Sequence, residues 1–223
     1  MASDYGLRLK QVFGLTEEMW ETFRPYAGQQ VFMNYAILLR PRSRGWVRLQ
    51  STEPFQHPQI DPKFFNDEYD LDVMVEGLRI ALQIGKTPPF QKYDARPITR
   101  KYPGCVNYKL YSDQYLRCMA QTLTLPIYHT IGTCKMGQKG DRTAVVDLDL
   151  KVKGVTGLRV VDASVIPNQI SGNTNIPVIA IAEKIADQMR GRRLKPMLPP
   201  MDKDLISKLP NLPYDTIEES QLF

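Results

Sequence analysis

Apolar residues recur at helical spacing between residues 67 and 85. In "DEYDLDVMVEGLRIALQIGK" they fall three and four positions apart, which places them on one face of a helix. Asn66 or Asp67 could cap the start of this helix, and Gly85, followed by two prolines, marks its end. The face expected to pack inward comprises Leu71, Met74, Val75, Leu78 and Leu82.

The same spacing predicts two further helices. The first covers residues 112–122, where Ser112 is the expected cap. The second covers residues 175–190 and is expected to stop at Gly191, a residue type common just past a helix end. Their inward faces are expected to comprise Tyr115, Leu116 and Met119 in the first, and Val178, Ala182, Ile185 and Met189 in the second.

Strand-like patterns occur in two places. Two apolar, partly β-branched runs within residues 31–50 flank a loop of proline, arginine and serine, which predicts an antiparallel hairpin. The run "LRVVDAS", residues 158–164, predicts a buried strand. After the hairpin, "STEPFQHPQIDPKFF" carries three prolines and predicts an extended connection, with His57 as a surface loop residue.

The charge pattern and the length of the apolar runs argue against two classes of protein, nucleic-acid-binding and membrane-spanning. The chain has 29 Lys and Arg against 24 Asp and Glu, a formal net charge of +5. Its arginine clusters, at residues 40–48 and 190–193, lack aromatic platforms or a groove-reading motif, so we expect no nucleic-acid partner. The longest apolar run, "IPVIAIA", is too short to cross a bilayer, so we expect no membrane span.

Cysteine usage and the N-terminal residues add two expectations. The three cysteines, Cys105, Cys118 and Cys134, cannot all pair with one another and show no metal-like spacing. We therefore expect neither a disulfide framework nor a zinc site. The stretch "MASDYGLRLK" lacks the apolar segment of a secretory signal, which leaves the localisation unknown.

Two segments combine residue types that suit chemistry. In "YHTIGT", residues 128–133, His129 is a proton acceptor beside a turn of small residues that a ligand could approach; a core histidine bonded to backbone is the alternative. In "VVDASVIPNQISGNTNIP", residues 160–177, a strand leads into a helix start, whose N–H groups suit an electron-rich ligand. An Asn-rich capped turn is the alternative there.

Together these segments resemble the C-terminal region of the glucose–methanol–choline (GMC) oxidoreductases, flavoenzymes that use FAD to oxidise alcohols. The upstream "RPRSRGWVRLQSTEPFQHPQIDPKFF" and "LDVMVEGLRIALQIGKTPPFQKY" resemble the family's substrate domain, particularly in insect glucose-dehydrogenase-like members. About 45 residues separate the two C-terminal motifs, and the likeness covers roughly residues 30 to 190. The family stretch His-x-x-Gly-Thr-Cys-x-Met-Gly is matched by His129, Gly132, Thr133, Cys134, Met136 and Gly137, and the second motif by "LRVVDASVIP", "SGNTNIP" and "IAEKIAD".

The resemblance implies a catalytic role for two residues. His129 would take the hydroxyl proton of a small-molecule alcohol or sugar while hydride passes to flavin N5, and an imidazole has a pKa suited to that transfer. The family's second catalytic position, His or Asn, is assigned to Asn175, which could hold the alcohol oxygen but cannot act as a base. A quinone-like compound is the implied electron acceptor, and no metal is implied.

The resemblance also implies which residues contact FAD. Asp162 and Ala163 would approach its ribityl or pyrophosphate region, and Asn175 and Ile176 its isoalloxazine ring, with Tyr128 as a further contact. Cys134 would serve packing only.

One family element has no match here. No two glycines lie two apart, so the G-x-G-x-x-G turn that binds the FAD pyrophosphate is not found. We therefore expect the active-site-bearing C-terminal part of such an enzyme, as a fragment, an incomplete gene model or a truncated paralogue, inactive without an N-terminal Rossmann-type half that completes the FAD site. A non-catalytic binding or structural remnant is the alternative. A G-x-S-x-G hydrolase elbow is also missing.

The expected fold class is α+β. Residues 1–126 would form part of the substrate-binding domain, an antiparallel sheet with helices, and residues 127–190 the flavin-contacting strand and helix of an FAD-binding α/β domain. Residues 191–223, rich in proline and charge, would be an extended tail. Without the Rossmann-type half to cover them, Ile179, Ile181 and Ile185 are expected to be exposed to solvent.

Overall fold

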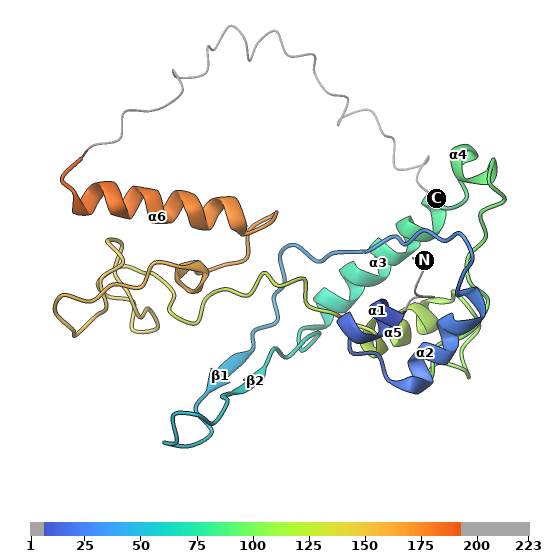
Figure 1. Ribbon diagram of the computed structural model, residues 1–223, viewed down its shortest axis with the longest axis horizontal. Helices are drawn as coiled ribbons and strands as arrows, with labels where there is room; N and C mark the ends of the chain where they lie inside the picture. Colours follow the sequence, from blue (N-terminus) through green and yellow to red (C-terminus); the bar gives the residue numbers. More distant parts are fainter. Residues whose placement is uncertain (1–6, 193–223) are drawn as a thin grey trace, which may run out of the picture.

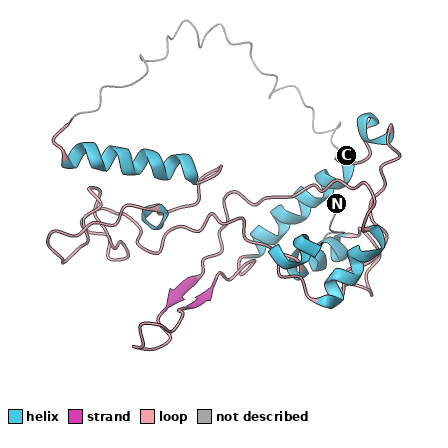
Figure 2. Cartoon of the chain, viewed as in Figure 1, coloured by secondary structure: helices cyan, strands magenta, loops and turns pink. Residues whose placement is uncertain are grey.

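Two lobes, each with its own apolar core, make up the part of the chain that the computed structural model describes, residues 7–192 (Figure 1). The first lobe is helical, and the second is a set of irregular segments packed beneath one long helix (Figure 2). A thin hairpin projects between them. The elements are α1 (Leu7–Val12), α2 (Glu17–Phe23), η1 (Arg24–Tyr26), β1 (Trp46–Arg48), β2 (Gln59–Asp61), α3 (Glu68–Ile84), α4 (Pro88–Gln91), α5 (Asp113–Thr122), η2 (Ala163–Val165) and α6 (Asn175–Met189).

The three predicted helices are confirmed as α3, α5 and α6. The Asp67 side chain accepts the Tyr69 N–H at 3.0 Å and so caps α3. The Ser112 hydroxyl oxygen accepts the Tyr115 N–H at 3.3 Å and caps α5. Past the end of α6, Gly191 has φ of +67°, in the left-handed region expected of a residue that ends a helix.

The core of the first lobe lies where α3 packs against α5. Tyr115 and Leu116 are each 1% exposed, as their predicted inward positions require. The Tyr115 hydroxyl accepts the backbone N–H of Tyr102 at 3.1 Å, so the buried phenol is satisfied. Burial raises the pKa of Tyr102 to about 12. The buried members of this core are Met19, Val75, Tyr102, Cys105, Tyr115 and Leu116.

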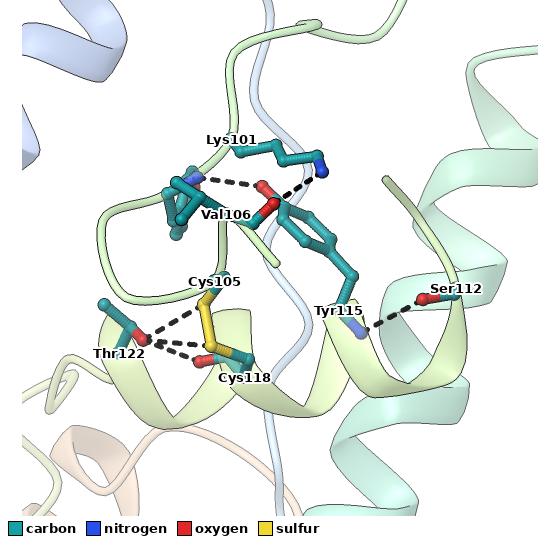
Figure 3. The surroundings of a disulfide bond; sticks show 8 residues. Lys101, Cys105, Val106, Ser112, Tyr115, Cys118 and Thr122 are labelled. Atoms are coloured by element: carbon teal, nitrogen blue, oxygen red, sulfur yellow. Dashed lines mark hydrogen bonds between the residues drawn. A yellow bond between two sulfur atoms is a disulfide. The ribbon is translucent and has the colours of Figure 1, made fainter. Parts of the chain in front are cut away.

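A disulfide between Cys105 and Cys118 fastens the loop before α5 to that helix (Figure 3). The two Cα atoms are 5.7 Å apart, and the Thr122 hydroxyl lies 3.4 Å from the Cys105 sulfur. The expectation of no disulfide is therefore wrong. An odd number of cysteines leaves one of them unpaired, here Cys134, but does not prevent the other two from pairing.

The prediction of a hairpin within residues 31–50 is also wrong, because the two runs of that segment do not pair with each other. Residues 31–39 form no strand, and the run at β1 pairs instead with β2, in the proline-containing connection, with Val47 opposite Ile60. The prolines flank β2, where a missing N–H breaks no ladder bond. A Cβ at Gly45 would lie 2.2 Å from the Asp61 carbonyl oxygen, so the base of the hairpin requires glycine. His57 is exposed in the connecting loop, as expected.

The second lobe lacks the predicted strand over residues 158–164. Arg159 makes one isolated bridge to Lys151, and residues 163–165 form the 3₁₀ turn η2, because no neighbouring strand runs alongside. In α6, Ile185 is buried at 4% exposure and Ile181 packs beside it. Three isoleucines of this helix were expected to stay exposed to water. Ile179 is exposed, at 48%, but the expectation is wrong for Ile185, which is buried. Ala182 and Met189 also lie outside the buried face that was predicted for this helix.

The described chain contains both helices and a sheet, as the predicted α+β class requires, but the sheet is small. The described chain has an antiparallel sheet of two three-residue strands, β1 and β2, rather than a broad sheet covered by helices. Of the predicted tail over residues 191–223, residues 193–223 lie outside the described part.

Candidate active site

His129 joins the two sequence motifs that lie about 45 residues apart. Its Nε2 is 2.9 Å from Oδ1 of Asn173, and its Nδ1 is 3.0 Å from Oγ1 of Thr174. Because an amide oxygen only accepts, Nε2–H donates to Asn173 and Nδ1 accepts from the Thr174 hydroxyl. Thr174 is buried at 7% exposure, whereas Asn173 is exposed. The half-buried imidazole therefore presents one nitrogen to the interior and the other to the open side of the site.

Backbone hydrogen bonds hold the two motifs in register. The Cys134 N–H donates to the Ser164 carbonyl at 3.1 Å, and the Met136 N–H donates to the Val165 carbonyl at 2.8 Å. Gly132 has φ of +86°, and a Cβ there would sit 3.6 Å from the Ile166 carbonyl oxygen. The histidine motif therefore lies directly against η2 and the loop that follows it.

Tyr128 adopts a backbone conformation that is unusual for a residue with a side chain. Its φ is +61°, in the left-handed region, and its side chain is 79% exposed. Such conformations cost free energy and collect at functional sites. This residue immediately precedes His129 in the chain and is exposed.

The N-terminus of α6 lacks the usual side-chain cap. Thr174 occupies the cap position, but its hydroxyl is hydrogen-bonded to His129 and no side chain accepts from the first turn. A capping threonine typically contributes about 1 kcal/mol to helix stability, which is forgone here. The first turn contains no acidic residue either. The N–H groups of Asn175 and Ile176 therefore keep the partial positive charge of a helix start.

The structure brings Asn173, rather than the predicted Asn175, to His129. Asn175 is the first residue of α6 and is exposed, while both ring nitrogens of His129 are already bonded to Asn173 and Thr174. The sequence held a usable signal. A helix expected to begin at Asn175 leaves Asn173 in the preceding loop, from which a side chain can turn back toward the histidine.

The other predicted flavin contacts lie on the same two segments. Asp162 is exposed, and its carboxylate accepts the Ser164 N–H at 2.8 Å, so it caps η2. Ala163 is the first residue of η2 and is half-buried. Ile176, in the first turn of α6, is 71% exposed. Cys134 is half-buried and unpaired.

The family model for GMC oxidoreductases matches residues 41–182, which include His129, Asn173 and Thr174. The chain belongs to the GMC oxidoreductase family. Relatives in this family carry the names of flavin-dependent enzymes, such as glucose dehydrogenase [FAD, quinone]. The loop of residues 40–44, the hairpin, α3, α5 and both motifs thus all fall within the matched region or at its edge.

Two insect GMC oxidoreductases and one fungal structure illustrate the similarity. The chain is 39% identical over 150 residues to glucose dehydrogenase [FAD, quinone] of Drosophila pseudoobscura pseudoobscura, covering 67% of this chain and 24% of that protein. It is 43% identical over 155 residues to ecdysone oxidase of Bombyx mori, covering 70% and 22%. The structure of a fungal aryl-alcohol oxidase superposes with a TM-score of 0.57 at 32% identity, covering 67% of this chain and 24% of that one. The chain thus spans about a quarter of the length of these relatives.

A surface hollow lies away from the histidine motif, residues 128–137. It has a volume of about 700 Å³ and runs between the loop after α1 and the end of α5, with Leu15, Met19 and Leu123 among its lining residues. His129 is not part of its wall.

Two kinds of feature are missing from residues 7–192. No group of three or more His, Cys, Asp and Glu side chains in that part of the chain could hold a metal ion. No helix in the same part is both long and apolar enough to cross a membrane.

Proposed function

We propose that His129 is the proton acceptor of a flavin-dependent enzyme that oxidises the CH–OH group of a small alcohol or sugar. The observation that carries this proposal is the imidazole fixed between the two motifs, with its buried nitrogen on Thr174 and its exposed nitrogen on Asn173. A histidine kept only for packing would not need an exposed partner. Membership of a family of FAD-dependent oxidoreductases supports the same reading.

The residues around His129 suit an FAD. The uncapped start of α6 offers N–H donors and partial positive charge to the electron-rich edge of a flavin ring. Ile176, in the first turn of α6, and Tyr128, next to His129 in the chain, are both exposed apolar residues, of a kind that suits the flat face of the ring. Asp162 and Ala163, held by backbone bonds next to the histidine motif, are the residues that we place toward the ribityl chain or pyrophosphate. When bound, FAD supplies the acceptor for the hydride that leaves the alcohol carbon.

The proton goes to the exposed side of the imidazole. An incoming hydroxyl can replace Asn173 at Nε2, because Asn173 is exposed and Thr174 is not. The ring proton then resides on Nδ1, where the Thr174 hydroxyl accepts it, and Nε2 has a free lone pair. The substrate hydroxyl gives its proton to Nε2 as its carbon loses hydride, and the product is a carbonyl.

Asn173 takes the role that the sequence assigned to Asn175. Its amide can donate an N–H to the alcohol oxygen and hold it beside Nε2, which is 2.9 Å from the Asn173 amide oxygen. An amide cannot accept the proton, so His129 acts as the only base of the pair.

Reduction of bound flavin by alcohols tests this function. A flavin-loaded enzyme that joins this chain to a Rossmann-type half is mixed anaerobically with a panel of primary alcohols, aldose sugars and secondary alcohols, and flavin absorbance is recorded. Bleaching by at least one class, with release of the matching carbonyl compound, is expected. Flavin that binds without being reduced by any of them would favour the alternative, a non-catalytic remnant of the family.

The electron acceptor is tested on the same reduced protein. We propose a quinone-like acceptor, because a similar relative is named a glucose dehydrogenase [FAD, quinone]. The reduced flavin is then expected to be reoxidised by a benzoquinone much faster than by dissolved oxygen. Faster reoxidation by oxygen would make the protein an oxidase, as another similar relative, ecdysone oxidase, is named.

A further inference from the structure

Two arginines fasten the loop before β1 to the loop that carries Asn173. Arg40 Nε donates to Oγ of Ser171 at 2.7 Å, and Arg44 Nη2 donates to Oδ1 of Asn168 at 3.3 Å. These bonds span 131 and 124 residues of sequence. Figure 1 shows the segment that leads into β1 passing between the helical lobe and the lobe that contains α6.

The loop of residues 167–173 depends on such side-chain ties. Among the described residues, no backbone-to-backbone hydrogen bond involves any of these seven positions, although the segments on either side are well bonded. Its position is set by the bonds from Arg40, Arg44 and His129. Since Ser171 lies two residues before Asn173, a shift at Ser171 moves the side chain that contacts the imidazole.

The other end of the tie is anchored in the first lobe. Asp70, in the first turn of α3 and 1% exposed, accepts the backbone N–H groups of Arg42 at 2.7 Å and Ser43 at 2.8 Å. The Ser43 hydroxyl in turn accepts the Asp67 N–H at 3.0 Å. The loop of residues 40–44 is therefore a fixed support, and the arginines that project from it act on the neighbouring loop.

We propose that Arg40 is a positioning residue for His129: through Ser171 it holds the 167–173 loop so that Asn173 and Thr174 keep the imidazole in one orientation, with its proton on Nε2 until a substrate hydroxyl replaces Asn173 there. The functional meaning of this tie rests on the function proposed above, but the tie itself does not. Arg40 contacts neither substrate nor flavin in this account, and Arg44 reinforces it from the same support.

The imidazole ring is the reporter for this proposal. The chain has only two histidines, so a long-range ¹H–¹⁵N spectrum of the labelled 223-residue chain shows two rings, and exposed His57 is the internal reference. The spectrum is taken at a pH about two units above the ordinary histidine pKa. The native His129 ring is expected to show one protonated and one unprotonated nitrogen, whereas the His57 ring averages its tautomers.

Three arginine variants form the test. Arg40→Ala is expected to give His129 the averaged spectrum of His57 and to slow flavin reduction by about tenfold to a hundredfold, the usual cost of a misplaced reacting group. Arg40→Lys, which retains one donor, is expected to recover most of the fixed-tautomer signal. Arg48→Ala is the matched control, because Arg48 stacks on Trp46 in the hairpin, 4.6 Å from the ring centroid, and is expected to leave the spectrum unchanged.

Ser171→Ala removes the same bond from the other side and keeps the test decisive if Arg40→Ala fails to fold. A fixed-tautomer spectrum in both Arg40→Ala and Ser171→Ala would overturn the proposal. The proposed function fails separately, if His129→Gln leaves flavin reduction unchanged while the Arg40→Ala spectrum still averages.

Discussion

His129 has two hydrogen-bond partners, Asn173 and Thr174. The sequence predicts the histidine more readily than either partner. The histidine itself was predictable, because it begins a motif of fixed spacing with Gly132 and Cys134. Asn173 had only an indirect signal, its place in the loop before a helix start, and Thr174 had none, because the direction of a loop side chain depends on contacts made across the fold. The asparagine that contacts the imidazole is Asn173, two positions before the Asn175 to which the sequence assigned the second catalytic position.

Asp70 carries a prediction about acid stability. Burial by itself would raise its pKa, but the N–H groups of Arg42 and Ser43 and the Arg42 charge outweigh it and lower the pKa below the ordinary value. A lowered pKa means that the ionised form stabilises the native state above the ordinary pKa. That stabilisation is expected to be lost as the pH falls below about 4 through the native pKa.

The variant Asp70→Asn isolates this effect. One of the two backbone N–H groups would then face an amide N–H2, so the free energy of unfolding is expected to fall by about 1 to 3 kcal/mol at neutral pH, and its slope below pH about 4 to flatten. Urea titrations at a series of pH values give both quantities. Asp72→Asn is the matched control, because Asp72 makes an exposed ion pair with Arg117 and should cost about 1 kcal/mol or less. Equal losses in the two variants would contradict the account.

Helices and strands differed in how far sequence alone could place them. Spacing and caps are local, so the start of α3 at Asp67 and of α5 at Ser112 followed from a few adjacent residues. Strand pairing is not local. The run over residues 31–39 has strand-like composition, yet only a neighbouring strand could make it part of a sheet, and β1 found its partner in the proline-containing segment instead.

The Cys105–Cys118 disulfide carries a prediction at this scale. It closes a short loop, with a sequence separation of 13 residues, over the buried face of α5. Cross-links of this loop length stabilise by about 3 kcal/mol, chiefly by restricting the unfolded chain. Reduction, or the variant Cys118→Ser, is expected to lower the free energy of unfolding by that order in denaturant titrations.

Cys134→Ser is the control for the disulfide, because Cys134 is unpaired and lies in the other lobe. It is expected to change stability by less than about 1 kcal/mol. A protein equally stable with and without a reducing agent would show that the cross-link contributes nothing.

At the scale of the whole molecule, the described chain leaves apolar surface uncovered. Two cores could be expected from the helix faces, but how much surface stays open was not predictable, because it depends on how the lobes are placed. Ile185 turned inward whereas Ile179 did not. The exposed side chains include Val31, Phe32, Ile37 and Leu39 before β1, Ile80 and Ile84 on α3, and Ile176 and Ile179 on α6.

Such surface predicts self-association of residues 1–223 expressed alone. Exposed apolar surface favours association in water. Light scattering after gel filtration is expected to show species larger than a monomer, and flavin absorbance after desalting is expected to be well below one FAD per chain. The double variant Ile80→Lys and Ile84→Lys, at exposed positions, should reduce the association without disturbing either core. A monomer that retains stoichiometric FAD would contradict this expectation.

The central claim, that His129 accepts the substrate proton, is tested most directly by the rate of anaerobic flavin reduction in stopped flow. His129→Gln keeps a polar side chain of similar size but cannot take up the proton. It is expected to slow reduction by about a hundredfold to ten-thousandfold while the flavin stays bound. His57→Gln, in the exposed loop of the hairpin, should reduce flavin at the native rate. A loss of less than about tenfold in His129→Gln would contradict the base role.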